Sequence, residues 1–219
     1  MTVSEEEILN ILDTFKDFDF LKPIFEDTRV DEFAVFLFNK GWVFNYDYGT
    51  TKLVICPLHK DYVIKIPFGG YYDLGDRLHR FEEADIDNEW DYCKVEYERY
   101  KNISESIFKD CFAETIFIGL ANNYPIYLQE RCIPYNDTYK KSQKKTLSME
   151  HFLSKSSIDL ECINASWCID LLRYYGAKKF KEFLTLIKKI GWDDDLGYDN
   201  VGYKNGHPII IDFSGFREE

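Results

Sequence analysis

Residues 42–68, "WVFNYDYGTTKLVICPLHKDYVIKIPF", decide the fold class of this chain. They hold three short runs of mostly aromatic and β-branched residues: "WVFNY" (42–46), "KLVIC" (52–56) and "YVIKI" (62–66). Runs of this kind are typical of β-strands. A glycine-containing turn follows the first run and a polar turn follows the second, so the stretch predicts an antiparallel meander.

The residues before the meander predict helices. Ser4 followed by Glu7 forms a capping box ahead of an apolar run, so we expect a helix to begin directly after Ser4. A second helix is expected over "VDEFAVFLF" (30–38). We therefore expect residues 1–41 to form a helical extension that packs on the small sheet.

The residues after the meander predict one more helix, two more strands and then a helical part. Apolar residues recur at helical spacing in 87–103, and "ETIFIGL" (114–120) and "YPIYLQE" (124–130) read as strands. Two or three helices are expected up to Ile190, and two short strands after them. The predicted fold class is α+β, with a small antiparallel sheet and one helix ahead of a mostly helical part.

The composition limits the classes of function. The length of 219 residues fits one domain, or one domain in two lobes, and 45% apolar residues provide for a sizeable core. A net charge of −12 argues against a general binder of nucleic acid or of anionic membranes. The charge is uneven, since Lys140 to Lys189 carry 11 Lys or Arg and 5 Asp or Glu. That basic stretch is most simply a solvated helical surface, and a partner-binding face is the alternative.

The cysteines and the N-terminus indicate a cytoplasmic protein. The six cysteines form no CxxC pair and no zinc-binding spacing. The first residues, "MTVSEEEILN", are acidic where a secretory signal would be basic and then apolar. No apolar run approaches the roughly 20 residues of a membrane span. We expect reduced thiols and no membrane partner.

The candidate chemistry lies in residues 193–219, "DDDLGYDNVGYKNGHPIIIDFSGFREE". Asp195 and Asn200 have the spacing D-x-x-x-x-N, and Asp212 follows at the end of the apolar run "PIIID". Oxygen-bearing side chains on adjoining turns suit Mg²⁺, which takes few protein ligands and completes its shell with water and phosphate. Phosphoryl transfer needs mainly positioning and charge neutralisation, so this small set of residues suffices for it.

This spacing, with D-F at a strand end, resembles the catalytic loop and metal loop of protein-kinase-like enzymes. The upstream parts follow in the family's order: Lys65 on the third strand, as in the "VAIK" pattern, and Glu96 on the next helix with apolar residues four and seven positions later. "DYGTTKLVI" occupies the place of the glycine-rich phosphate loop. "PIYLQERC" is similar to the fifth strand and the hinge after it. The resemblance covers residues 42–216.

The resemblance implies a role for each matching residue. Lys65 would contact the α- and β-phosphates of ATP, held in place by an ion pair with Glu96. Asn200 and Asp212 would bind Mg²⁺, and Asp195 would orient the acceptor hydroxyl or take its proton. The chain would then be an ATP- and Mg²⁺-dependent phosphotransferase, a kinase, acting on a hydroxyl of a dedicated protein or small-molecule acceptor.

The resemblance also implies contacts to the nucleotide from the sheet. Gly49 would let the loop backbone approach the phosphates, because a side chain there would collide with them. Asp47 would repel the phosphates unless it points outward, and Lys52 beside them could offset its negative charge. Backbone groups from Glu130 to Cys132 would face the adenine.

The sequence departs from the family pattern in several places. Asp193 and Asp194 stand where His-Arg usually precedes the catalytic Asp, the phosphate loop keeps one glycine of three, and Ser214 replaces a glycine. Only seven residues follow Asp212, so we expect no activation segment and no peptide-docking platform.

The expected organisation is an N-terminal helical extension (1–41), a kinase-like N-lobe (42–132) and a truncated kinase-like C-lobe (133–219). Such a trimmed, bilobal form is similar to RIO-type and lipopolysaccharide-type kinases, and to small kinase-like proteins of bacteriophages. These atypical kinases also lack an activation loop.

Two functional classes stay open. The complete set of five site residues favours an active kinase, with transfer of AMP as a smaller variant. The eroded phosphate loop and the missing platform favour a pseudokinase, a nucleotide-binding module that regulates a partner protein. A calcium loop is disfavoured, because the residues after Asp193 lack the EF-hand order. A D-x-D sugar-nucleotide site through Asp193 and Asp195 has no parallel sheet to support it.

Overall fold

The computed structural model describes residues 1–21, 25–49, 51–68, 91–135, 165–189 and 197–214. The chain is mixed α+β and divides into two compact units, which are treated separately below. Unit 1 comprises Met1–Glu98 and Glu114–Arg131, and unit 2 comprises Arg99–Ala113 and Cys132–Glu219.

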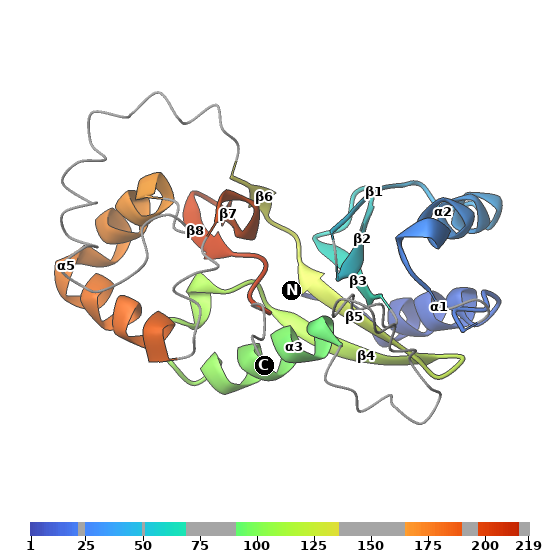
Figure 1. Cartoon of the computed structure of the whole chain (residues 1–219), viewed down its shortest axis with the longest axis horizontal. Coiled ribbons are helices and arrows are strands. Elements are labelled where there is room, and N and C mark those ends of the chain that lie inside the picture. The colour runs from blue at the N-terminus through green and yellow to red at the C-terminus, as the bar shows by residue number, and fades with distance from the viewer. Residues whose placement is uncertain (22–24, 50, 69–90, 136–164, 190–196, 215–219) are drawn as a thin grey trace, which may run out of the picture. The chain divides into compact units, whose positions relative to one another are not determined.

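Unit 1 is built on a five-stranded antiparallel sheet with the order β1-β2-β3-β5-β4 (Figure 1). Its strands are β1 (Phe44–Tyr48), β2 (Lys52–Pro57), β3 (Tyr62–Pro67), β4 (Thr115–Ala121) and β5 (Tyr124–Glu130). The predicted meander and both later strands are confirmed. The first strand begins two residues later than predicted and runs up to the turn, where the Gly49 N–H donates to the Lys52 carbonyl at 3.1 Å.

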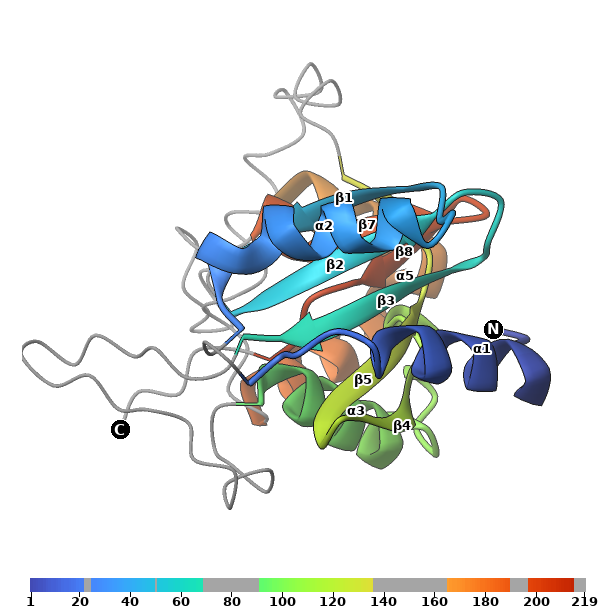
Figure 2. The ribbon, with the colours of Figure 1, turned by 90° about the vertical axis from the view of Figure 1, so that its right-hand side faces the viewer.

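The N-terminal helices cover one face of this sheet (Figures 1 and 2). Helix α1 (Glu5–Phe15) begins where the capping box predicts, because the Ser4 hydroxyl accepts the N–H of Glu7 at 3.2 Å. A short 3-10 turn, η1 (Asp27–Arg29), leads into α2 (Val30–Asn39), the second predicted helix.

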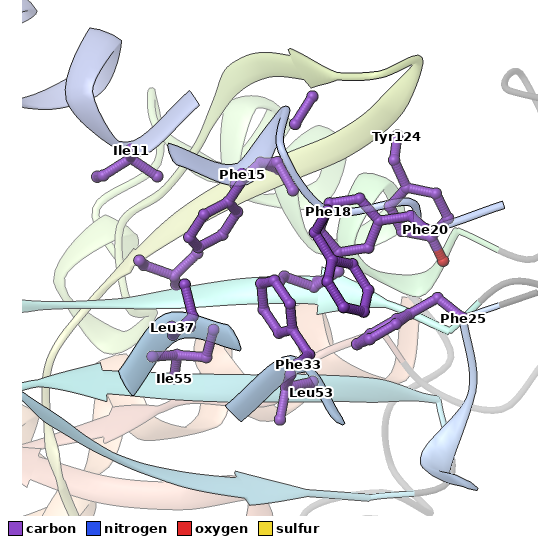
Figure 3. Packing of buried hydrophobic residues seen from close by; sticks show 14 of the residues in the cluster. Ile11, Phe15, Phe18, Phe20, Phe25, Phe33, Leu37, Leu53, Ile55 and Tyr124 are labelled. Atoms are coloured by element: carbon purple, nitrogen blue, oxygen red, sulfur yellow. The ribbon is translucent and has the colours of Figure 1, made fainter. Parts of the chain in front are cut away.

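An aromatic core fills the space between these helices and the sheet (Figure 3). Its fully buried rings include Phe15, Phe20, Phe25 and Phe33. Phe15 and Phe33 meet edge to face with centroids 5.2 Å apart, a favourable geometry for aromatic pairs. This face of the sheet is therefore closed to solvent by the extension.

Side chains alternate along the strands, so the opposite face of the sheet carries a different set. Leu53 of β2 and Ile64 of β3 point into the aromatic core. Their neighbours Lys52 and Lys65 are also buried and point to the other face, where helix α3 (Tyr92–Ile103) lies (Figure 2). The predicted helix is thus present, and the alternation sends two lysines toward it.

Unit 2 combines a small sheet with a long bent helix. Its elements are η3 (Lys109–Cys111), β6 (Ile133–Pro134), α5 (Ala165–Lys189), η5 (Tyr198–Asn200), β7 (Val201–Lys204) and β8 (His207–Ile210). The strands pair in the antiparallel order β6-β7-β8. The two final strands were predicted. The two-residue strand β6 was not, and it requires Gly202, where an added Cβ would lie 2.5 Å from the Ile133 carbonyl oxygen.

Helix α5 supplies much of the core of unit 2. Gly176 interrupts it with φ 78° and ψ 164°, so it consists of two helical segments, and the earlier part of the stretch predicted to be helical lies outside the described residues. Trp167, Phe180 and Phe183 are fully buried against other apolar side chains, including Phe213 after β8. The residues that follow β8 are therefore anchored in a packed core.

Three observations concern the described residues alone. The cysteines there, Cys56, Cys93, Cys111, Cys132 and Cys168, are free thiols, as predicted. No helix in the described ranges combines the length and apolarity needed to cross a membrane. Within those ranges, no group of three or more His, Cys, Asp or Glu side chains is placed to hold a metal ion.

Candidate functional site

A buried carboxylate joins two lysines in unit 1. Glu96 of α3 is fully buried, and its Oε2 lies 2.7 Å from Lys65 Nζ of β3. Its Oε1 lies 2.5 Å from Lys52 Nζ of β2. The ion pair expected between Lys65 and Glu96 is present, and Lys52 is a second cation on the same carboxylate. We name Lys52, Lys65 and Glu96 the lysine–glutamate cluster.

The local sequence explains how these three side chains meet. In the pairing of β2 with β3, Lys65 lies opposite Val54, two residues after Lys52 and therefore on the same face. Asp91 caps α3 by accepting the N–H of Lys94 at 2.8 Å, which fixes where the helix begins and so where Glu96 points. The turns after Glu96 are anchored by Tyr100 and Ile103, buried as the apolar spacing predicted.

Two polar residues complete the surroundings of Glu96. Gln129 of β5 donates from Nε2 to Glu96 Oε2 at 3.3 Å and to Thr115 Oγ1 of β4 at 3.0 Å. Both residues are buried, and they are direct partners across the two strands. The amide therefore gives the carboxylate a third donor, and the cluster is tied to four strands and a helix.

Burial raises the pKa of two groups near the cluster, Cys93 and Asp91. Burial raises the pKa of the Cys93 thiol well above its ordinary value, so this cysteine is no nucleophile at neutral pH. Burial also raises the pKa of Asp91, while hydrogen bonds from the Tyr127 hydroxyl and from the Lys94 N–H act the other way. Lys52 and Lys65, buried near these groups, supply the ammonium donors of the site.

Gly49 of the predicted phosphate loop directly follows β1. An added Cβ at Gly49 would meet nothing within 4 Å, so the fold itself does not require glycine there. Of the two alternatives for Asp47, the structure shows the outward-pointing one. Asp47 is exposed and accepts the N–H of Tyr48 at 2.9 Å, whereas the Lys52 ammonium is buried against Glu96.

The predicted hinge offers fewer donors than expected. The Glu130 N–H donates to the Glu114 carbonyl at 2.8 Å, and the Arg131 N–H donates to the Asp61 carbonyl at 2.8 Å. Both amides are therefore engaged within unit 1.

Two predicted metal ligands of unit 2 are brought together by the backbone. The carbonyl of Asn200 accepts the N–H of Ile211 at 2.9 Å and that of Asp212 at 3.3 Å. Both Asn200 and Asp212 are half-buried. Asp195, the predicted catalytic carboxylate, lies outside the described residues.

The donor set of this loop fits Mg²⁺. The side chains of Asn200 and Asp212 offer an amide oxygen and a carboxylate, which are the hard oxygen ligands that this ion takes. One carboxylate and one amide suffice for a phosphate-bound Mg²⁺, because water and phosphate complete its coordination shell.

The sequence left several residues around these sites unassigned. Lys52 was expected at a phosphate but not at Glu96, and Gln129 and Thr115 had no role. The buried polar pair had one signal, because Thr115 at the start of β4 and Gln129 near the end of β5 are polar residues beside apolar runs and lie opposite each other in the antiparallel pairing.

Comparison with known proteins adds no relative to this description. No family model, no curated protein and no solved structure matches the chain. Only the residues of this chain therefore indicate what it does.

Proposed function

We propose that this chain is an ATP- and Mg²⁺-dependent phosphotransferase with a kinase-like bilobal fold. The observation that carries the proposal is the lysine–glutamate cluster, in which the buried Glu96 lies 2.7 Å from Lys65 and 2.5 Å from Lys52. The acceptor is a hydroxyl of a protein or of a small molecule.

A buried ion cluster is a costly way to stabilise a fold. Removing a carboxylate and an ammonium from water costs several kcal/mol per ion, and apolar residues of similar size are often as stable. The cluster is better suited to positioning, because Glu96 fixes the direction of two ammonium groups. In the proposed reaction these ammonium groups donate to phosphate oxygens of ATP while Glu96 holds them in place.

The loop of unit 2 supplies the second half of the proposal. Asn200 and Asp212 would hold Mg²⁺, which neutralises charge on the phosphates. The acceptor oxygen forms a bond to the γ-phosphorus, the bond from that phosphorus to ADP breaks, and Asp195 takes the hydroxyl proton.

The second candidate function is nucleotide binding without transfer, as in a pseudokinase. The eroded phosphate loop favours it, because one glycine of three remains there and the exposed Asp47 stands in the place of another. Transfer of AMP would use the same cluster and the same loop. All three candidates begin with binding of ATP, and they differ in whether the γ-phosphoryl group, AMP or nothing is transferred.

The first test is thermal unfolding with ATP and Mg²⁺, together and singly. At a hundredfold excess over Kd, a ligand stabilises the folded protein by about 2.7 kcal/mol, which raises the melting temperature measurably. Lys65→Met should abolish this rise, and Lys101→Met, at an exposed position of α3, should retain it. Absence of any rise in the wild-type protein, with any nucleotide and metal, would overturn the proposal.

The second test separates transfer from binding. The wild-type protein is incubated with ATP labelled at the γ-phosphate, and in parallel with ATP labelled at the α-phosphate. Label from the γ-position on an acceptor indicates phosphoryl transfer, and label from the α-position indicates AMP transfer. Binding with neither product supports the pseudokinase.

A further inference from the structure

The loop after β8 is held in place by its own backbone and by the core of unit 2. Ile211 and Asp212 donate their N–H groups to the Asn200 carbonyl, at 2.9 and 3.3 Å. The side chain of Phe213 is 1% exposed, and its ring meets that of Phe112 edge to face with centroids 5.6 Å apart. The backbone on both sides of Asp212 is therefore anchored.

An arginine binds the same loop from helix α3. Arg99 Nη1 lies 2.7 Å from the Phe213 carbonyl oxygen and 2.6 Å from the Ser214 carbonyl oxygen. A guanidinium group is always charged and donates short, strong hydrogen bonds. The two carbonyls belong to the peptide groups before and after Ser214, so Arg99 fixes the backbone conformation at that residue.

Ser214 in turn contacts the carboxylate of Asp212. Its Oγ donates to Asp212 Oδ1 at 3.0 Å, and its N–H approaches the same oxygen at 3.5 Å. Ser214 is only 5% exposed. Fixing one oxygen of a carboxylate removes its rotation about the terminal bond, so the direction of the other oxygen is set as well. A glycine at this position would provide no hydroxyl.

We infer that Arg99 and Ser214 are positioning residues that aim the carboxylate of Asp212 at a bound divalent cation. Arg99 fixes the backbone of Ser214, and the Ser214 hydroxyl fixes the carboxylate. The inference rests on the proposed function, in which Asp212 is a metal ligand. Groups that orient a ligand in this way typically change metal affinity by roughly 10- to 100-fold when they are removed.

A role in folding alone would give a different result. Loss of the Ser214 hydroxyl would then lower the melting temperature equally with and without the cation. A positioning role predicts instead a change in the concentration of Mg²⁺ that gives half of the ATP-dependent thermal shift. Binding of ATP without metal should not change, since Asp212 has no part in it.

The experiment titrates Mg²⁺ at a fixed, saturating concentration of ATP and follows the melting temperature. We expect Ser214→Ala to raise the half-saturating Mg²⁺ concentration roughly 10- to 100-fold. Ser214→Thr keeps a hydroxyl and should stay within about threefold of the wild type. Arg99→Met should raise the half-saturating concentration several-fold. Arg173→Met, which removes an exposed arginine paired with Asp170, should leave it unchanged.

The outcomes distinguish this inference from the proposed function. If the wild-type protein responds to Mg²⁺ and Ser214→Ala responds at the same concentration, the positioning role is wrong and the proposed function stands. If the wild-type protein shows no response to Mg²⁺ with ATP, both are wrong. Should Arg99→Met fail to fold, the comparison of Ser214→Ala with Ser214→Thr still decides the question.

Discussion

The two halves of the candidate site differ in burial. The charged residues of unit 1 are buried, whereas the polar residues of unit 2 are half-buried. In unit 1, Glu96 is fully buried and the exposed fractions of Lys52 and Lys65 are 3% and 4%. In unit 2, Asn200 and Asp212 are half-buried; the Asn200 carbonyl accepts the N–H groups of Ile211 and Asp212, and the Asp212 carboxylate accepts the Ser214 hydroxyl. Charges inside a protein depend strongly on one another, whereas charges beside solvent are screened by water.

This difference separates two kinds of mutational effect. A change in the lysine–glutamate cluster should lower the stability of the protein even without any ligand. A change at the loop of Asp212 should leave the free protein intact and alter only its response to ligands. The predictions below test this separation, beginning with the largest expected effect.

Glu96→Gln should cause the largest loss of stability. The amide keeps the shape of the side chain but leaves two buried ammonium groups without their shared negative charge. Removing one partner of a buried ion pair lowers the free energy of unfolding by about 3–5 kcal/mol. Urea denaturation followed by circular dichroism measures this loss. Glu98→Gln, at an exposed position two residues later in α3, is the control and should change stability by less than about 0.5 kcal/mol. Equal stability of both variants would contradict the burial argument.

Asp212→Asn should have the opposite profile. The amide oxygen can still accept the Ser214 hydroxyl, so we expect the free energy of unfolding to change by less than about 1 kcal/mol. The stabilisation by ATP with Mg²⁺, about 2.7 kcal/mol at a hundredfold excess over Kd, should disappear. The same thermal assay measures both quantities. Asp110→Asn removes an exposed carboxylate of unit 2 and should keep the response. A large loss of stability in the ligand-free variant would contradict this prediction, because Asp212 would then stabilise the fold as the buried charges of unit 1 do.

Local sequence patterns predicted part of the fold and of the candidate site. The capping box at Ser4, the three strands of the meander and the helical spacing around Glu96 each depend on a few neighbouring residues. The pairing of Lys65 with Glu96 followed from a resemblance in the order of motifs. The side of the chain on which a strand residue lies is also a local property, because side chains alternate.

The remaining contacts depend on geometry between segments far apart in the sequence. Lys52 reaches Glu96 only because the hairpin register puts it on the same face as Lys65. Arg99 and Ser214 are separated by 115 positions, and nothing near either residue indicates that they bond. Register, helix direction and loop conformation are set by packing of the whole unit, so these contacts needed coordinates.

Lys52→Met and Lys65→Met, alone and together, should show coupling within the cluster. With one lysine removed, Glu96 keeps the other and the repulsion between two ammonium groups is relieved. With both removed, the carboxylate loses both ion pairs. We therefore expect the double variant to lose about 1 kcal/mol or more beyond the sum of the single variants, as measured by urea denaturation. Additive losses would mean that the two lysines do not share Glu96.

Glu7 offers the smallest effect and sharpens the comparison, because its ion pair lies near the surface of unit 1. Lys60 and Tyr62 both donate to its carboxylate, and the side chain of Glu7 is 23% exposed. The hydrogen bond from Lys60 holds the pKa of Glu7 below its usual value of 4.5. A depressed carboxyl pKa stabilises the fold above the unfolded pKa, and this contribution is lost as the pH falls through the folded value.

Stability of the wild type should therefore exceed that of Glu7→Gln by less than about 1 kcal/mol at pH 7, and the difference should shrink below pH 4.5. Salt should reduce the difference at pH 7, whereas the loss in Glu96→Gln should change little with salt, because buried charges are screened far less. A difference between wild type and Glu7→Gln that grows on acidification would contradict the assigned direction of the pKa.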